Sequence, residues 1–479
     1  MGKPDADRSG TIVAVLAFAG IIASVMQTLV IPLIAKFPTM LHTTADNATW
    51  VITSTLLVAA VATPVAGRLG DLFGKRRILL LSTIPLIVGS IVCALSDSVL
   101  PMIVGRGLQG MGVGIVPLGI SVMRDVLPAE KLGSAVALLS ASLGIGGALG
   151  LPIAAAVAEY SDWRVLFWGA AVLSALIAVA VYLAVPESTV RARGGFDYVG
   201  ALGIGAGLVA LLLAVSKGGS WGWGSPTVVG LFAAAIVVLV AWGWWELRLD
   251  DPLVDLRVAA RPAVLFTNAA SVVIGVAMYS ASLIVPQILQ LPTATGYGLG
   301  QSMMAMGLWM APGGVMMMLI SPLGARLSAA RGPKVTLISG ALVIAAGYAL
   351  TTGLMGSTWG LLAATCVING GVGLAYGAMP ALIMSSVPIS ETASANSFNT
   401  LMRSVGTSAS SAVIGMVLAQ MTMSFHGVDV PTEGGFQTGL LIGCGVAVVA
   451  AVFASFIPAR RPQPPVTVDE IVEPVAVRA

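Results

Sequence analysis

Fourteen apolar stretches, each long enough to cross a bilayer, constrain the fold of this chain more than any other feature. A transmembrane helix needs about 20 mostly apolar residues. Only 9% of the residues are charged, whereas a soluble domain carries about 25%, so lipid must solvate much of the surface. The sequence therefore predicts an all-α integral membrane protein. The fourteen predicted spans lie at about 11–35, 48–69, 78–96, 101–123, 132–158, 165–185, 199–215, 227–245, 263–291, 299–321, 335–354, 358–386, 394–423 and 434–457.

The positive charges are distributed unevenly between the two sides of this topology. Of the 24 lysines and arginines, Lys36, Arg164 and Lys217 fall in loops on one side, and Arg106 and Arg403 fall within spans. The remaining nineteen fall in the termini and in the loops of the other side. Basic loops remain on the cytoplasmic side of a membrane. We therefore expect a multi-pass protein of the plasma or inner membrane with both termini in the cytoplasm.

The most basic turn, GRLGDLFGKRR at 67–77, lies between the second and third spans. A single acid stands there among four basic residues. The turn resembles the signature loop between helices 2 and 3 of the major facilitator superfamily of transporters. The residues that carry this resemblance are Gly67, Leu69, Asp71, Gly74, Lys75 and Arg76. A weaker copy, LSAARGPK at 327–334, lies between spans 10 and 11 and has Ala329 in place of the acid.

The two copies predict two related six-helix halves, with spans 7 and 8 inserted between them. Four short sequences also resemble the fourteen-helix drug:proton antiporter branch: RGLQG at 106–110, FDYVG at 196–200, WGW at 221–223 and DLR at 255–257. We expect two pseudo-symmetric six-helix bundles plus two inserted transmembrane helices. The expected divisions are an N-terminal bundle at 1–190, the inserted pair with its flanking loops at 191–261, a C-terminal bundle at 262–459 and a disordered cytoplasmic tail at 460–479.

The resemblance implies that the basic turn is a conformational gate. In the family its acid faces a helix N-terminus of the other half, which here is the start of span 13, near Ser394 and Asn396. Helix N-termini favour anions electrostatically. The alternative is a local salt bridge that only orders the turn. The expected gate residues are Gly67, Asp71, Gly74, Lys75 and Arg76.

Arg106 lies in the middle of the fourth span, where a charge is costly unless it faces the bundle interior and finds partners. The resemblance implies that Arg106 takes part in proton or substrate coupling, and Gln109 shares its face of the helix. The alternative is a structural arginine bonded to backbone carbonyls of a neighbouring helix.

The branch usually has an Asp-x-Thr motif in span 1, and this chain has Met26-Gln27-Thr28 there. No Asp or Glu lies deep in any predicted span, and Glu159, at the outer end of span 5, is the closest. Partial burial would make Glu159 a candidate proton carrier, whereas pairing with Arg164 would leave it a solvated helix end. If Glu159 is a solvated helix end, then Asp71 or Asp46 titrates, or coupling works in another way, or transport is not coupled to protons.

Polar, aromatic and methionine side chains within the spans are candidates to line a substrate cavity. Span 10 is rich in methionine, a flexible side chain that suits varied apolar ligands; contact with lipid or with neighbouring helices is the alternative. Arg403 resembles an arginine common at this place in the branch, for which a structural interface role is the alternative. The candidates are Met26, Gln27, Tyr279, Gln287, Met306, Trp309, Met310, Asn369, Tyr376, Asn399 and Arg403.

The resemblance implies a secondary active transporter that exports amphipathic or hydrophobic small molecules by alternating access, coupled to protons. The alternative is a dedicated exporter of one metabolite, self-made antibiotic or lipid, with weak or no proton coupling. The spans hold no cluster of His, Asp, Glu or Cys at catalytic or metal-binding spacing, so we expect no enzyme activity, metal or cofactor. The expected partners are the small-molecule substrate, protons and the lipid bilayer, without nucleic acid. We expect a monomer.

Overall fold

The computed structural model describes residues 6–33, 36–425 and 428–458. Fourteen helices in this part of the chain are long and apolar enough to cross a membrane. This confirms the predicted fold class: the protein is a multi-pass α-helical membrane protein. The predicted tail at 460–479 lies outside the described residues.

Six spans form the first half of the chain, two are inserted, and six form the second half. The first-half spans are α1 (Ala6–Thr28), α3 (Ala45–Phe73), α4 (Lys75–Ala94), α5 (Val99–Gly110) continued by η2 (Met111–Gly114) and α6 (Ile115–Val126), α7 (Ala129–Tyr160) and α8 (Arg164–Ala184). The inserted spans are α9 (Tyr198–Trp221) and α10 (Pro226–Glu246). The second-half spans are α12 (Pro262–Gln290), α13 (Met303–Arg331), α14 (Pro333–Leu354), α15 (Thr358–Met384), α16 (Thr392–Gln420) and α17 (Glu433–Ser455).

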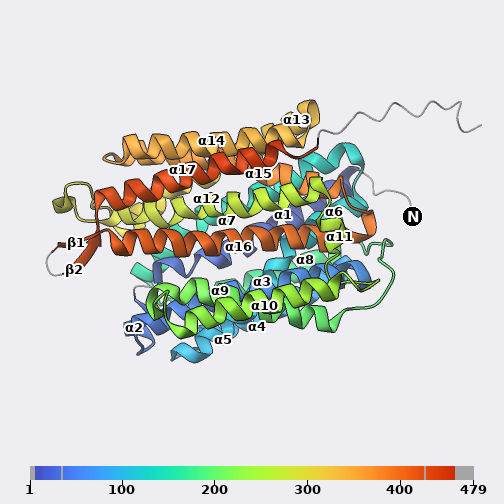
Figure 1. Cartoon of the computed structure of the whole chain (residues 1–479), viewed down its shortest axis with the longest axis horizontal. Helices are drawn as coiled ribbons and strands as arrows, with labels where there is room; N and C mark the ends of the chain where they lie inside the picture. Colours follow the sequence, from blue (N-terminus) through green and yellow to red (C-terminus); the bar gives the residue numbers. More distant parts are fainter. Residues whose placement is uncertain (1–5, 34–35, 426–427, 459–479) are drawn as a thin grey trace, which may run out of the picture.

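Short elements join the spans at both ends of the bundle. They are η1 (Ile31–Leu33), α2 (Phe37–Met40), α11 (Leu256–Ala259), η3 (Thr293–Thr295), η4 (Ile389–Glu391) and the antiparallel hairpin of β1 (Thr422–Phe425) and β2 (Val428–Pro431). Figure 1 shows α11 at one end and α2 with the hairpin at the other. We call the first of these, which also carries the turn at 67–77, the basic end, and the second the hairpin end.

Glycines with positive φ connect equivalent helices in the two halves. Gly74, with φ +108°, lies between α3 and α4, and Gly332, with φ +87°, lies between α13 and α14. Residues with a Cβ rarely adopt this conformation. The shared backbone geometry explains why each copy of the repeated turn has a glycine at this position.

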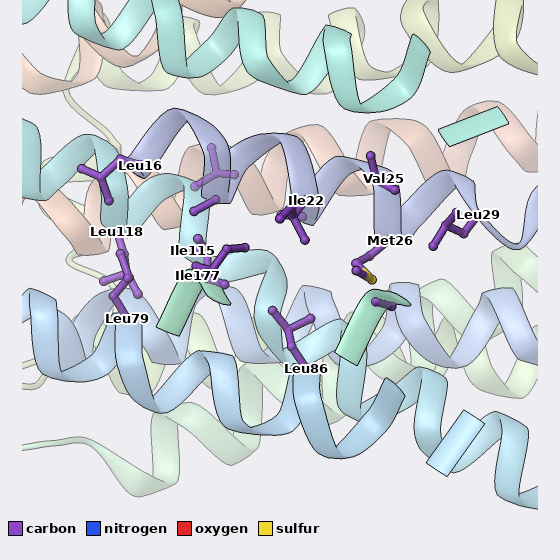
Figure 2. Close-up of a cluster of buried hydrophobic side chains, with 14 of the residues drawn as sticks. Leu16, Ile22, Val25, Met26, Leu29, Leu79, Leu86, Ile115, Leu118 and Ile177 are labelled. Carbon is purple, nitrogen blue, oxygen red and sulfur yellow. The ribbon is translucent and has the colours of Figure 1, made fainter. Parts of the chain in front are cut away.

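Each half packs around its own apolar core. In the first half, side chains of α1, α4, α6 and α8 meet, among them Leu16, Met26, Leu79, Leu118 and Ile177 (Figure 2). In the second half, a separate cluster gathers side chains of α12, α13, α14, α15 and α17. Two separate cores let the halves move as units, because each half keeps its own buried surface.

The halves meet along two seams, where α3 packs against α16 and α7 packs against α13. Small residues permit these close approaches. A Cβ added to Gly67 of α3 would lie 2.6 Å from the Cβ of Ser397, and a Cβ added to Gly144 of α7 would lie 2.9 Å from the carbonyl oxygen of Gly314. The two seams therefore bring backbones, and not only side chains, into contact.

The inserted pair lies over the α3–α16 seam, and both helices run along one side of the bundle in Figure 1. Leu208 and Leu212 of α9 pack with Leu57 of α3 and Leu401 of α16. Near the hairpin end, Lys217 of α9 donates a 2.8 Å hydrogen bond to the Thr49 hydroxyl. Helix α10 packs on α9. The insertion thus contacts both halves at once.

Gly144→Ala should lower the thermal midpoint of the purified protein, because the new methyl group would press against the backbone of Gly314. Overpacking of this kind costs about 1–3 kcal/mol. Gly147→Ala, on the same helix, is the matched control, since a Cβ there meets no atom within 4 Å. Equal midpoints for both variants would contradict the close approach at the α7–α13 seam.

Candidate functional site

The Asp71 carboxylate binds the N-terminus of α16, across the α3–α16 seam. Its Oδ1 accepts a 3.1 Å hydrogen bond from the backbone N–H of Ala393, and its Oδ2 accepts bonds from the backbone N–H (2.8 Å) and the hydroxyl (2.7 Å) of Ser394. Asp71 is completely buried. A buried anion is stabilised by the free N–H groups and the dipole at a helix N-terminus. The contact expected near Ser394 is present, and its role as a gate stays a prediction.

Lys75 links Asp71 to a second buried acid, Asp125, that the sequence analysis missed. The Nζ of Lys75 lies 2.8 Å from Asp125 Oδ2 and 3.7 Å from Asp71 Oδ1, and the lysine side chain is fully buried. The hydroxyl of Ser188, just after α8, donates a 2.5 Å hydrogen bond to Asp125. The turn is therefore held by a buried Asp–Lys–Asp chain, and the local salt bridge and the contact with α16 occur together.

Arg124, at the basic end of α6, is a second contact between the halves that the sequence analysis missed. Its guanidinium donates to the Thr392 hydroxyl (2.5 Å) and to the Val387 carbonyl (3.1 Å). These acceptors lie immediately before and at the start of α16, next to the partners of Asp71. The adjacent Arg124-Asp125 pair at the end of a span was the signal available in the sequence.

The other expected gate residues stabilise the first half around the turn. Arg76 donates to the backbone carbonyl of Tyr182 on α8, and its guanidinium lies 5.1 Å from the centroid of the tyrosine ring. Gly67 allows α3 to approach Ser397. Gly74 provides the positive φ that turns the chain into α4.

Arg106 is buried inside the first half, where it binds mainly backbone carbonyls. It donates to the carbonyls of Met26 on α1 (3.0 Å) and Val51 on α3 (3.4 Å) and to Gln109 Oε1 (2.6 Å). Gln109 in turn donates to the hydroxyl of Ser90 on α4 at 2.8 Å. This arrangement is the structural alternative considered for Arg106, and no carboxylate pairs with it among the described residues.

Glu159 is exposed, as in the alternative of a solvated helix end, and its part in proton coupling stays a prediction. The pairing with Arg164 is absent, because Arg164 binds Asp97 at 2.6 Å and Asp162 at 3.7 Å. The acids with buried side chains in the described spans are Asp71, Asp125 and Glu246, all near the ends of helices at the basic end. The side chain of Asp46 lies outside the described residues.

Some cavity candidates meet in the second half. The guanidinium of Arg403 on α16 lies 4.4 Å from the centroid of the Tyr376 ring, and the Tyr376 hydroxyl lies 3.2 Å from Met278 Sδ. The carbonyl of Tyr376 accepts a hydrogen bond from Ser140 of α7 at 3.2 Å, which places this group next to the first half.

Asn399 belongs to a separate polar group within the second half. Its amide donates to Asn268 (2.9 Å) and Ser271 (2.7 Å) of α12. Asn399 and Asn268 are buried, so these bonds satisfy polar groups that join α16 to α12. This role is structural rather than one of lining an open surface.

The remaining candidates do not form one cluster. Trp309 donates to Gln301 (3.0 Å) and packs edge-on against Trp359, and Met306 is buried in the second-half core with Met310 packed beside it. Met26, Gln27 and Arg106 line a small cavity in the first half. The others are scattered: Asn369 bonds the Thr365 carbonyl of its own helix, Gln287 is exposed, and Tyr279 is partly buried.

Hydrogen bonds between the two halves, in the described part of the chain, lie toward the basic end. Beyond those of Asp71 and Arg124, Ser321 of α13 donates to the Ala137 carbonyl of α7 at 2.7 Å, and Ser140 binds Tyr376 as described above. The described residues contain no group of three or more His, Cys, Asp or Glu that could hold a metal ion. The site is therefore a closed contact between two helical bundles.

Comparison with known proteins identifies the family. The family model described as Major Facilitator Superfamily matches residues 16–411. The chain belongs to this superfamily. Members of this superfamily are transporters rather than enzymes, and they share one fold. The fold is similar to that of the human organic anion transporter MFSD10 (TETRAN), with a TM-score of 0.65 and 15% identity over 93% of this chain and 99% of that one. The fold is also similar to that of the proton:xylose symporter XylE, with a TM-score of 0.65 and 15% identity over 95% of this chain and 97% of that one.

Several bacterial relatives are similar in sequence. An MFS-type transporter of Mycobacterium tuberculosis is 30% identical over 414 residues, which are 85% of this chain and 59% of that protein. Multidrug transporter protein MdtP of Bacillus subtilis is 26% identical over 77% of this chain and 68% of that protein. Multidrug resistance protein Stp of Mycobacterium tuberculosis is 26% identical over 78% of this chain and 69% of that protein. This chain thus spans about three-fifths of the length of the first of these relatives.

Asp71→Asn should lower the thermal midpoint of the purified protein, because it removes the charge that binds the α16 N-terminus and Lys75. Such charge–dipole contacts contribute about 0.3–2 kcal/mol. Since Asp71 binds Ser394 directly, the double variant with Ser394→Ala should lose less stability than the sum of the single variants. Asp97→Asn, at an exposed acid of the hairpin end, is the control. Additive losses would contradict an energetic contact across the seam.

Arg106→Lys should also lower the thermal midpoint, although the charge is kept. A lysine has no planar fork with which to reach carbonyls on α1, α3 and Gln109 together, and each buried acceptor left without a donor costs about 1–3 kcal/mol. Arg77→Lys, at an exposed position of the basic turn, should leave the midpoint unchanged. An Arg106→Lys protein as stable as the wild type would refute the carbonyl network as the role of this arginine.

Proposed function

We propose that this protein exports amphipathic or hydrophobic small molecules by alternating access, coupled to protons. The observation that carries the proposal is the position of the inter-half hydrogen bonds, which bind the two bundles together at the basic end. If the bias of Lys and Arg places this end in the cytoplasm, the structure is a state closed toward the cytoplasm. Relatives named multidrug transporters support drug-like substrates.

The chemistry of the interior supports neutral amphipathic substrates over organic cations. The candidates Tyr376 and Arg403 lie next to the interface between the halves, and Met278 contacts Tyr376, so this group is aromatic, positively charged and sulfur-containing. Such groups bind apolar and aromatic surfaces, whereas the fixed positive charge of Arg403 repels an organic cation. The buried acids Asp71, Asp125 and Glu246 lie at the basic end, away from this group.

Asp71 is the acid that we propose for proton coupling. The resemblance to drug:proton antiporters implies an acid that titrates during the cycle, and Glu159 is exposed. Protonation of Asp71 would remove the charge that binds the α16 N-terminus, and with it the main electrostatic contact that keeps the basic end closed. Proton binding and opening toward the cytoplasm would then be linked through a single carboxyl group.

Export should be measured in inside-out vesicles with a neutral dye, N-phenylnaphthylamine, and a permanent cation, ethidium. We expect an inward-acidic pH gradient to accelerate uptake of the neutral dye, and a protonophore to abolish the acceleration. Asp71→Asn should lose most of this transport, whereas Glu159→Gln should keep it. Uptake of neither dye would contradict the substrate class, and gradient-driven uptake by well-inserted Asp71→Asn protein would remove Asp71 from the coupling step.

A further inference from the structure

The inserted helices end in two carboxyl groups that take no part in the contacts between the halves. Asp197 caps α9, and its Oδ1 accepts hydrogen bonds from the Gly200 N–H (2.8 Å) and the Trp245 indole (3.4 Å). Glu246 is the last residue of α10, and its Oε2 accepts a 3.4 Å bond from the N–H of Val254. Glu246 is only 1% exposed.

The second oxygen of each carboxyl group is buried without a hydrogen-bond donor. These atoms are Asp197 Oδ2 and Glu246 Oε1. Both atoms lie close to Gly200 of α9. A Cβ added to Gly200 would meet Asp197 Oδ2 and would lie 2.6 Å from Glu246 Oε1. Two acceptor oxygens thus face one small space, and neither makes a hydrogen bond there; the indole N–H of Trp242, which lies near Glu246, is also without a partner.

No cation forms an ion pair with either carboxyl group in the described part of the chain. The Arg248 guanidinium lies 3.6 Å from the Trp244 ring, and Arg257 donates to the Leu247 carbonyl. The indole of Trp242 and the N–H of Leu253 also face Glu246. The other charged groups near this end line the adjacent cavity between the α10–α12 segment and α16: Arg68, Arg193, Asp250, Asp251, Asp255 and Glu391.

We propose that Asp197 and Glu246 share one proton and form a protonation site at the basic end of the inserted helices. Two ionised carboxylates cannot occupy such a space without a large cost in desolvation and repulsion. One proton removes both costs, because the protonated group donates an O–H to the other carboxylate. A metal ion would need more ligands than two carboxyl groups, and no group of three exists here among the described residues.

The site also binds the segment that connects the insertion to the second half. Glu246 accepts the N–H of Val254, and Leu253 and Val254 pack with Leu57 of α3 and Leu401 of α16. Loss of the proton would leave two negative charges beside this segment. The protonation state of the pair should therefore control how firmly the segment packs across the α3–α16 seam.

Infrared titration of the purified full-length protein tests the proposal without any transport measurement, so it succeeds or fails independently of the proposed function. The wild type should show the carbonyl stretch of one carboxylic acid at neutral pH and lose it at alkaline pH. Glu246→Gln and Asp197→Asn, which keep the shape of the side chain and one acceptor oxygen each, should each lack this band. Glu159→Gln, at an exposed acid, should keep it.

The pH dependence of thermal stability gives a second readout. The unfolded chain releases this proton at about pH 4, whereas the folded chain retains it at neutral pH, so stability should fall as pH rises above about 4 until the proton leaves the folded chain. Relative to Glu246→Gln, the folding equilibrium constant of the wild type should fall about tenfold per pH unit in that range. A wild type without the band, a band that survives in both variants, or parallel pH profiles would each overturn the proposal.

Discussion

The buried carboxylate of Asp71 is the interaction on which the arrangement of the two halves depends. A completely buried charge is tolerated only when it is fully hydrogen-bonded or paired, and here the donors come from the other half of the protein. The Lys75–Asp125 pair keeps the carboxylate in place from its own side. The buried carboxylate is stabilised only when the donors of both halves bind it together, so the contact is either made or broken. That is the property required of a two-state transition.

The inserted helices add a second constraint to the same seam. Helix α9 packs on α3 and α16 together, and Lys217 binds the hairpin end of α9 to α3 through Thr49. At the basic end, the segment after α10 packs across the seam and leads directly into α12. Any separation of α3 from α16 must therefore change the contacts of α9. The insertion is placed where it can favour one conformation of the transporter over the other.

Buried polar groups in the helices have two different roles. Arg106, Gln109 and Ser90 form a network within the first half, and Asn399, Asn268 and Ser271 form one within the second. These networks make each bundle rigid, because every member loses a partner if one helix moves. The groups that can change partners are those at the seams, such as Arg124 and Asp71. Rigid halves with polar contacts concentrated at one end are what alternating access requires.

The sequence by itself determined the number of spans, the glycine turns and the contact of Asp71 with span 13. These follow from bilayer thickness, from the backbone freedom of glycine and from a turn whose residues are contiguous. Asp125 and Arg124 were missed and the exposure of Glu159 was left open, because burial and pairing depend on which helix faces which neighbour. An apolar helix in lipid can present any face to its partners, and periodicity does not distinguish a lipid-facing side from a packed one. Only the tertiary structure decided that Arg106 binds carbonyls and that Glu246 meets Asp197, since those partners lie on different helices.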